Sequence, residues 1–242
     1  MVSANASVGE LIEKLIALPQ DWSPYGTLYP EVLKAIAYHC SKMDIWHSLE
    51  TGCGKSTLLF SHLSRHHKVF AMDVDQNGNF KKVQNSPFLN SISVEFIEGP
   101  TQRTLPQHRF DHQIEAALID GAHGYPFPEL DYYFIYPLLK PGGILIVDDI
   151  QIPTIRNMFN FLKRDEMFSL IEVVRNTAFL RRTERPTFDP YGDNWEFQNY
   201  NMRDRLGEAV PSFLKAWVPK PIKRSIKNAT YWVIKRLEER LT

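Results

Sequence analysis

Residues Leu49 to Leu59, LETGCGKSTLL, join the end of an apolar run to the start of a helical pattern through a glycine-rich turn. A strand that passes through glycines into a helix is the first half of a βαβ unit. The N–H groups that open such a helix have no intrahelical partner and can face a ligand. This stretch therefore predicts an α/β fold with a ligand site at the end of the strand.

Apolar runs and helical patterns alternate along the chain. We expect strands in DIWHSLE, KVFAMD, SVEFIEG, IEAALID and GILIVDD, and helices in VGELIEKLIAL, YPEVLKAIAYHC, STLLFSHLSRHH, GNFKKVQN, PELDYYFIYPLL and TIRNMFNFLKRDE. This alternation predicts a mostly parallel sheet with helices on both faces. FSLIEVVRN and TAFLRRT then read as an antiparallel hairpin that closes it. The expected fold is α/β and Rossmann-like, with seven strands.

Three segments are expected: helices over residues 1–40, a core over 41–182 and an extension over 183–242. In the extension, the aromatic segment from Phe188 to Tyr200 is either a lid over an acceptor or a loop wrapped over the sheet edge. The basic tail predicts a helix from about Lys223 to Leu241. Such a helix docks on the body or on a partner chain, including a second copy, or lies on an anionic membrane. Membrane contact is not favoured.

Composition excludes several classes of protein. The formal net charge is zero, which argues against a nucleic-acid partner. The chain has two cysteines, which fits a reducing compartment without a disulfide framework. The N-terminus lacks the basic segment and following apolar run of a signal peptide. No apolar run approaches the length of a membrane span. The expected location is the cytoplasm.

The glycine turn resembles two unrelated ligand sites. A triphosphate loop reads G-x-x-x-x-G-K-[ST], but Leu49 stands at its first glycine, and the Glu50 carboxylate would repel phosphate. A turn for S-adenosylmethionine fits better, because that ligand is cationic and Glu50 suits it. Asp73, which ends the next expected strand, could accept hydrogen bonds from both ribose hydroxyls. The turn is therefore predicted to bind S-adenosylmethionine.

Beyond the turn, five segments resemble the class I S-adenosylmethionine-dependent methyltransferases: ETGCGKST, AMDVD, FIEGPTQRTLP, ALIDGAHGYPFPELDYYFIYPLLKPGGILIVDD and EVVRNTAFLRRT. The resemblance covers about residues 25 to 182. It is strongest to the macrolide-sugar O-methyltransferase branch, which is similar to the catechol type. Ser56 departs from the family, which often has a third glycine there. The resemblance implies a cofactor site made of Glu50, Thr51, Gly52, Gly54, Ser56, Asp73, Gly99, Pro100, Thr101 and Asp120.

Three carboxylates are expected to converge at one edge of the sheet. Asp120 ends the fourth expected strand, and Asp148 and Asp149 end the fifth. Neighbouring parallel strands end side by side, so these groups repel one another unless a cation lies between them. Oxygen ligands favour Mg²⁺ or another hard divalent cation, and the catechol type has metal ligands at the matching positions. The alternative is metal-free use of the same carboxylates, with Asp148 facing the cofactor.

Among basic side chains near this edge, His123 is the candidate general base, acting with Asp120 and Asp148. It could instead hydrogen-bond loop backbone or hold Asp120 or the cofactor in place. His62, His66 and His67 are expected at the surface, and Lys55 is expected to face solvent or a carboxylate.

The sequence thus predicts an S-adenosylmethionine-dependent methyltransferase that performs metal-assisted O-methylation of a hydroxylated small molecule. The resemblance implies a sugar of a natural product or glycan, or a vicinal diol. Alternatives are a metal-independent N- or O-methyltransferase, a nucleotide-triphosphate hydrolase and a non-catalytic binding module.

Overall fold

The structure is a computed structural model that describes residues 4–19, 27–73, 79–193, 195, 198 and 200–201. The described residues up to Gly192 belong to one compact unit, and those from Asp193 onward belong to a second. The expected tail helix, Lys223 to Leu241, lies outside the described residues, as does Phe197 of the aromatic segment. None of the described helices combines the length and the apolar character needed to cross a membrane.

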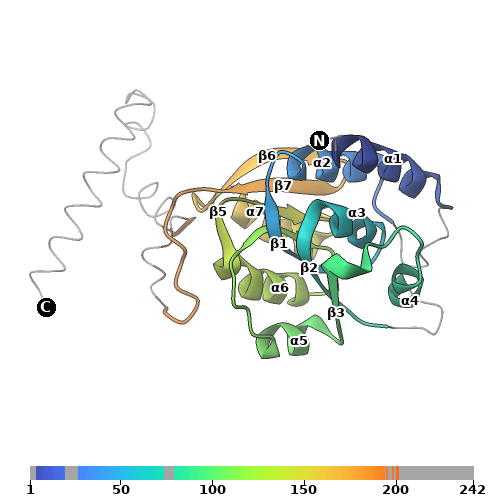
Figure 1. The fold of residues 1–242 in the computed structure, drawn as a ribbon. Coiled ribbons are helices and arrows are strands. Elements are labelled where there is room, and N and C mark those ends of the chain that lie inside the picture. Colours follow the sequence, from blue (N-terminus) through green and yellow to red (C-terminus); the bar gives the residue numbers. More distant parts are fainter. Residues whose placement is uncertain are drawn as a thin grey trace, which may run out of the picture. The chain divides into compact units, whose positions relative to one another are not determined.

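The first unit is built on one mixed sheet. Its strands are β1 (Ile45–Thr51), β2 (Ser64–Ala71), β3 (Val94–Glu98), β4 (Ile114–Ile119), β5 (Leu139–Val147), β6 (Phe168–Val174) and β7 (Thr177–Arg182). They lie in the order β3-β2-β1-β4-β5-β7-β6 (Figure 1). Strands β1 to β5 run parallel, and β7 is antiparallel to both β5 and β6. The predicted seven-stranded sheet with a closing hairpin is confirmed.

The helices alternate with the parallel strands. They are α1 (Ala4–Ala17), α2 (Pro30–Cys40), α3 (Lys55–Leu63), α4 (Asn79–Gln84), α5 (Thr101–Gln107), α6 (Phe127–Ile135) and α7 (Pro153–Leu162), with short 3₁₀ turns at Ser91–Ser93 and Tyr136–Leu138. Pro30 and Pro153 each open a helix, where the missing N–H costs nothing.

The two faces of the sheet bury separate hydrophobic clusters, as expected for strands buried on both sides. In β5, Ile144 and Ile146 join the cluster that also contains apolar residues of α1, α2 and α3. Leu145 and Val147 point the other way and pack with residues of α6 and α7. The helical segment before β1 is therefore part of the same core as the sheet.

Two local expectations were wrong. The helix predicted in STLLFSHLSRHH ends at Leu63, and Ser64 already begins β2. His67 alternates inward on that strand and is buried, whereas the sequence placed it at the surface; His62 and His66 are exposed as expected. The sequence also missed α5, because Pro106 within it argues against a helix.

His67 also explains the polar residues inside β1. Ser48 is buried, and its hydroxyl lies 2.7 Å from Nδ1 of His67 on β2. Because each side chain supplies the other's hydrogen bond, this pair can be buried between strands. His47 points to the opposite face of the strand, so its polarity needs no buried partner.

The order of the strands predicts at which edge of the sheet a ligand binds. Strand β1 lies between β2 and β4, so the connections after β1 and after β4 leave the sheet in opposite directions. In parallel α/β sheets, ligands bind outside the carboxyl ends of the strands at such a switch point.

Candidate functional site

The glycine turn after β1 lies at this switch point. Gly52 has φ +90, and a Cβ there would lie 2.1 Å from the carbonyl oxygen of Asp120. No L side chain fits that position, so Gly52 lets the ends of β1 and β4 approach. A Cβ on Gly54 would meet no heavy atom within 4 Å of it. The turn is therefore closed against the sheet at Gly52 and open at Gly54.

Glu50 lies beneath this turn and is fully buried. Its carboxylate accepts hydrogen bonds from the hydroxyls of Ser56, at 2.7 Å, and Thr57, and His67 Nε2 lies 3.2 Å away. These contacts join the first turn of α3 to β1 and β2. Glu50 and Ser56 thus support the turn from below with their side chains already paired.

Lys55 begins α3 but points away from the turn. The structure corrects the expectation that it faces solvent or a carboxylate, because it is buried and its Nζ donates to the carbonyl of Leu18 at 3.1 Å. Burial lowers the pKa of Lys55. This ammonium therefore anchors the end of the N-terminal helical segment.

The second predicted ligand contact, Asp73, follows the end of β2. Its Oδ2 lies 3.3 Å from Nζ of Lys81. Its Oδ1 is buried and has no hydrogen-bond partner among the described residues. A buried carboxylate oxygen without a donor is costly, so this atom is suited to accept a hydrogen bond from a ligand.

The predicted adenine edge, Gly99 to Thr101, follows the end of β3. Gly99 has φ +137, and its N–H donates to the carbonyl of Ala71 at 2.9 Å. Thr101 is buried and begins α5, preceded by Pro100. The structure therefore brings Gly52, Asp73 and Gly99 to the ends of three adjacent strands.

Asp120 and Asp148 sit one residue beyond β4 and β5. The N–H of Asp120 donates to the carbonyl of Thr51, and that of Asp148 to the carbonyl of Ile119, each at 3.1 Å. Burial, followed by the charges of Asp148, Asp149 and Glu50, raises the pKa of Asp120 well above its ordinary value. Burial also raises the pKa of Asp148. A cation at this edge would relieve both effects.

The predicted metal set was Asp120, Asp148 and Asp149, and the structure brings a fourth residue, His123, close to it. The Oδ1 atom of Asp148 accepts a hydrogen bond from the Thr177 hydroxyl on β7. Asp149 has φ +55, and its Oδ2 lies 3.2 Å from Nε2 of His123. Asp120, His123 and Asp149 each offer a ligand atom, and these atoms all lie within 4.8 Å of one another. His123 thus lies close enough to Asp120 and Asp149 to share a cation with them.

Asp131 on α6 is a site residue that the sequence analysis missed. It is 1% exposed, and a Cβ on Gly121 would lie 3.0 Å from its Oδ2. Burial raises its pKa to about 6, and the Thr101 and Thr51 hydroxyls offset part of this rise. Neither carboxylate oxygen makes a well-formed hydrogen bond to a described residue. An acidic residue within an otherwise apolar helical pattern was the signal for it.

The aromatic segment is tied down at its start. Tyr133 on α6 and Tyr136 in the following 3₁₀ turn donate hydrogen bonds to the carbonyls of Pro190, at 2.7 Å, and Phe188, at 3.1 Å. Phe188 packs against the α6 and α7 face of the sheet. These contacts anchor the start of the segment, whereas Tyr191 is 95% exposed.

A family comparison identifies the domain that carries this site. The model of a methyltransferase domain family matches residues 49–150, from the end of β1 to just beyond β5. Residues 49–150 form a methyltransferase domain. The predicted class I S-adenosylmethionine-dependent methyltransferase is thereby confirmed, and the glycine turn lies within the matched residues. No curated protein matches the chain.

Solved structures agree with this methyltransferase fold. An O-methyltransferase from Bacillus cereus in complex with SAH has a TM-score of 0.53 at 15% identity, covering 76% of this chain and 93% of its own. The O-methyltransferase TomG from Streptomyces achromogenes, in complex with SAM, has a TM-score of 0.53 at 13% identity, covering 76% of this chain and 91% of its own. The SAH-bound methyltransferase PaMTH1 from Podospora anserina has a TM-score of 0.51 at 15% identity, covering 76% of this chain and 89% of its own. At these identities the likeness concerns the fold alone.

Proposed function

We propose that this methyltransferase transfers the methyl group of S-adenosylmethionine to a hydroxyl oxygen of a small molecule. The observation that carries the proposal is the arrangement at one sheet edge. There an open glycine turn and the unpartnered Oδ1 of Asp73 lie on the same side as the cluster of Asp120, His123 and Asp149. The first two suit the methyl donor, and the cluster suits activation of an acceptor.

The cofactor would lie across the ends of β1, β2 and β3. S-adenosylmethionine supplies a methyl group on a positively charged sulfur. Gly54 leaves room for its methionine portion beside the N–H groups that begin α3. Asp73 would accept hydrogen bonds from the ribose hydroxyls, and Gly99 to Thr101 would border the adenine. Glu50 holds the turn and contributes its negative charge from below.

We propose that a divalent cation binds at Asp120, His123 and Asp149. Bound there, the ion would lower the pKa of the acceptor hydroxyl and hold its oxygen. The raised pKa of Asp120 supports this assignment, because burial and then the neighbouring carboxylates disfavour its charged form, which a cation would stabilise. A mixed set of two carboxylates and one imidazole suits Mn²⁺, Fe²⁺, Co²⁺ or Zn²⁺ as well as the predicted Mg²⁺. Asp148 would orient this edge through Thr177.

The acceptor is proposed to be a hydroxylated small molecule, a sugar or a vicinal diol, on the strength of the family resemblance. The related structures named above include two O-methyltransferases, which supports transfer to oxygen. We also propose that residues 41–182 carry the activity.

A second candidate is metal-independent methylation. The 3.2 Å contact between His123 Nε2 and Asp149 Oδ2 favours it, because a carboxylate at this distance can orient the imidazole as a general base. In that case His123 itself would take the proton of the acceptor. Turnover that persists in excess chelator would establish this candidate, whereas turnover restored only by added cation would support the metal.

Calorimetric titration with S-adenosylhomocysteine tests the cofactor assignment. We expect wild-type protein to bind it, and Asp73→Asn to bind about tenfold more weakly or worse, because an amide accepts hydrogen bonds less strongly than a carboxylate. Asp111→Asn, an exposed carboxylate far along the chain from the turn, is the matched control and should bind normally. Absence of binding by the wild type, or equal binding by Asp73→Asn, would contradict the assignment.

A further inference from the structure

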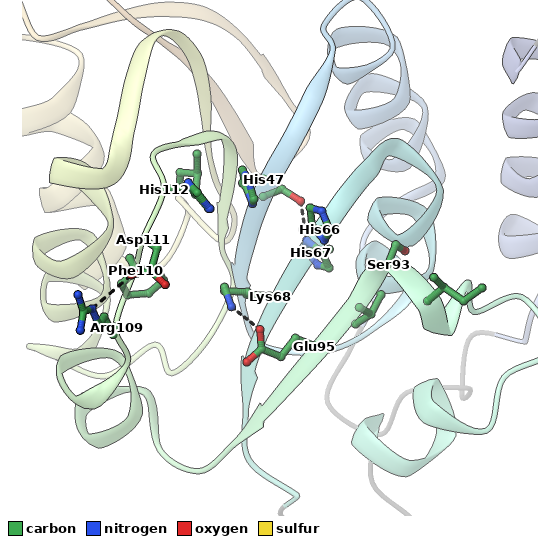
Figure 2. Close-up of a pocket in the computed structure, with 14 residues that line it drawn as sticks. His47, His66, His67, Lys68, Ser93, Glu95, Arg109, Phe110, Asp111 and His112 are labelled. Atoms are coloured by element: carbon green, nitrogen blue, oxygen red, sulfur yellow. Dashed lines mark hydrogen bonds and ion pairs between the residues drawn. The ribbon is translucent and has the colours of Figure 1, made fainter.

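A hollow lies at the opposite end of the strands from the glycine turn. It has a volume of about 360 Å³ and is lined by the first halves of β1 and β2, the start of β3 and the loop before β4 (Figure 2). Among its lining residues are His47, His66, His112, Lys68, Glu95 and Arg109. The proposed methyl-transfer site uses none of these side chains.

Three of these histidines form a row across the sheet. His47 on β1 and His66 on β2 are register partners on neighbouring strands. Their rings stack with centroids 5.2 Å apart at an interplanar angle of 19°. On its other side His47 stacks on His112 of the loop before β4, with centroids 4.6 Å apart at 22°. His47 is thus the central member of the row His66–His47–His112, and Figure 2 shows His112 and His47 side by side.

The backbone under the central histidine is fixed. The buried carboxylate of Glu115 accepts hydrogen bonds from the N–H groups of His47, at 2.8 Å, and Trp46, at 3.1 Å. Glu115 is itself paired with Lys140. These contacts hold His47 before the β1–β4 ladder begins at Ser48. The backbone at the central histidine is therefore held in place.

The charges around the row cancel locally. Lys68 is paired with Glu95, and Arg109 lies 3.3 Å from Asp111. A dication entering the hollow therefore meets two paired cations and three imidazoles. In slightly alkaline solution an imidazole is mainly neutral, which is the form that binds metals.

We propose that the row His66–His47–His112 binds one divalent transition-metal ion of the class that imidazole favours, such as Zn²⁺, Ni²⁺ or Cu²⁺. His47 is the central ligand. In this structure the rings stack, so binding an ion would require the side chains to rotate until their nitrogens face it. His66 and His112 are exposed, so they rotate freely at little cost. The ion would connect β2, β1 and the loop before β4 and stabilise that end of the sheet.

The experiment separates this row from the carboxylate cluster that contains His123. Full-length protein carrying His123→Gln is freed of metal and titrated calorimetrically with Zn²⁺. We expect it to bind one ion, and the added change His47→Gln to weaken binding about tenfold or more. Adding His62→Gln instead is the matched control and should leave affinity unchanged, because this exposed histidine on α3 contacts the carbonyl of Phe88, away from the row.

Two further measurements test the histidine row without depending on His47→Gln. His112→Gln changes an exposed loop residue and should weaken Zn²⁺ binding even if His47→Gln fails to fold. With Cu²⁺, electron paramagnetic resonance of the His123→Gln protein should show coupling to more than one imidazole nitrogen. The proposal is overturned if His123→Gln alone abolishes Zn²⁺ binding, or if both row variants bind as tightly as the control.

Discussion

At the scale of single residues, Gly52 and Gly54 have different roles two positions apart. Gly52 has a positive φ and no space for a Cβ, whereas Gly54 has extended backbone and open space beside it. Gly52 is therefore needed for folding. Gly54 matters for what enters the turn.

We expect Gly52→Ala to destabilise the protein by roughly 2–4 kcal/mol, through strain at positive φ and the clash with Asp120. Gly54→Val should fold with near wild-type stability but bind S-adenosylhomocysteine weakly, because its side chain occupies the open space. Urea denaturation and calorimetry check the two effects. Equal stability of Gly52→Ala and wild type would show that the turn can rearrange.

Asp131 predicts a pH dependence of stability. Its pKa rises from 3.8 when unfolded to about 6 in the fold, so the folded state holds its proton more tightly. The free energy of unfolding should therefore fall as pH increases from about 4 to about 6, by up to about 3 kcal/mol from this group. Asp131→Asn cannot ionise and should show a flatter profile. Parallel profiles for the two proteins, measured by denaturation across that range, would refute this role.

At the scale of elements, α3 is joined to the sheet by polar contacts with a buried charge. The Thr57 hydroxyl donates to Glu50, which Ser56 and His67 also contact. A helix whose first turn is held in this way keeps its N–H groups directed at the turn. The contact between α3 and β1 thus couples folding to the geometry of the ligand site.

Thr57→Val removes one donor from the buried Glu50 carboxylate while keeping the shape of the side chain. We expect a loss of about 1.5–3 kcal/mol, the range for hydrogen bonds to charged groups. Thr104→Val is the control, because that hydroxyl donates to the neutral carbonyl of Pro100 and should cost about 1 kcal/mol or less. Urea denaturation measures both. A smaller loss for Thr57→Val than for the control would mean that Glu50 does not depend on this donor.

At the scale of the whole molecule, the proposed cofactor site draws on the ends of three parallel strands, β1, β2 and β3. A ligand that binds there contacts residues far apart in the chain, so its binding should stabilise the unit as a whole. This property separates a working methyltransferase from a binding module that kept only the fold.

S-adenosylhomocysteine at 100 times its dissociation constant should raise the free energy of unfolding of the full chain by about 2.7 kcal/mol. Thermal denaturation should show the corresponding rise in melting temperature, and Asp73→Asn at the same ligand concentration should show less. An unchanged melting temperature of the wild type would favour the non-catalytic binding module.

The local pattern of apolar and polar residues was sufficient to predict most of the fold. Apolar runs such as ILIV, ending in acidic residues, predict parallel strands and their ligand edge, because a strand buried on both faces must be apolar throughout. The pattern failed where polar residues enter the core. Ser64 to His67 look like the end of a helix, yet they begin a strand, because His67 finds Ser48 and Glu50 on the neighbouring strand.

The sequence by itself therefore determined the class of fold, the glycine turn and the residues that reach the ligand edge. Only the tertiary structure decided which side chains meet there. It paired Asp148 with Thr177, brought His123 to Asp120 and Asp149, and placed Asp131 beside Thr51. The physical reason is that strand ends follow from local periodicity, whereas the direction of a polar side chain depends on partners supplied by distant segments.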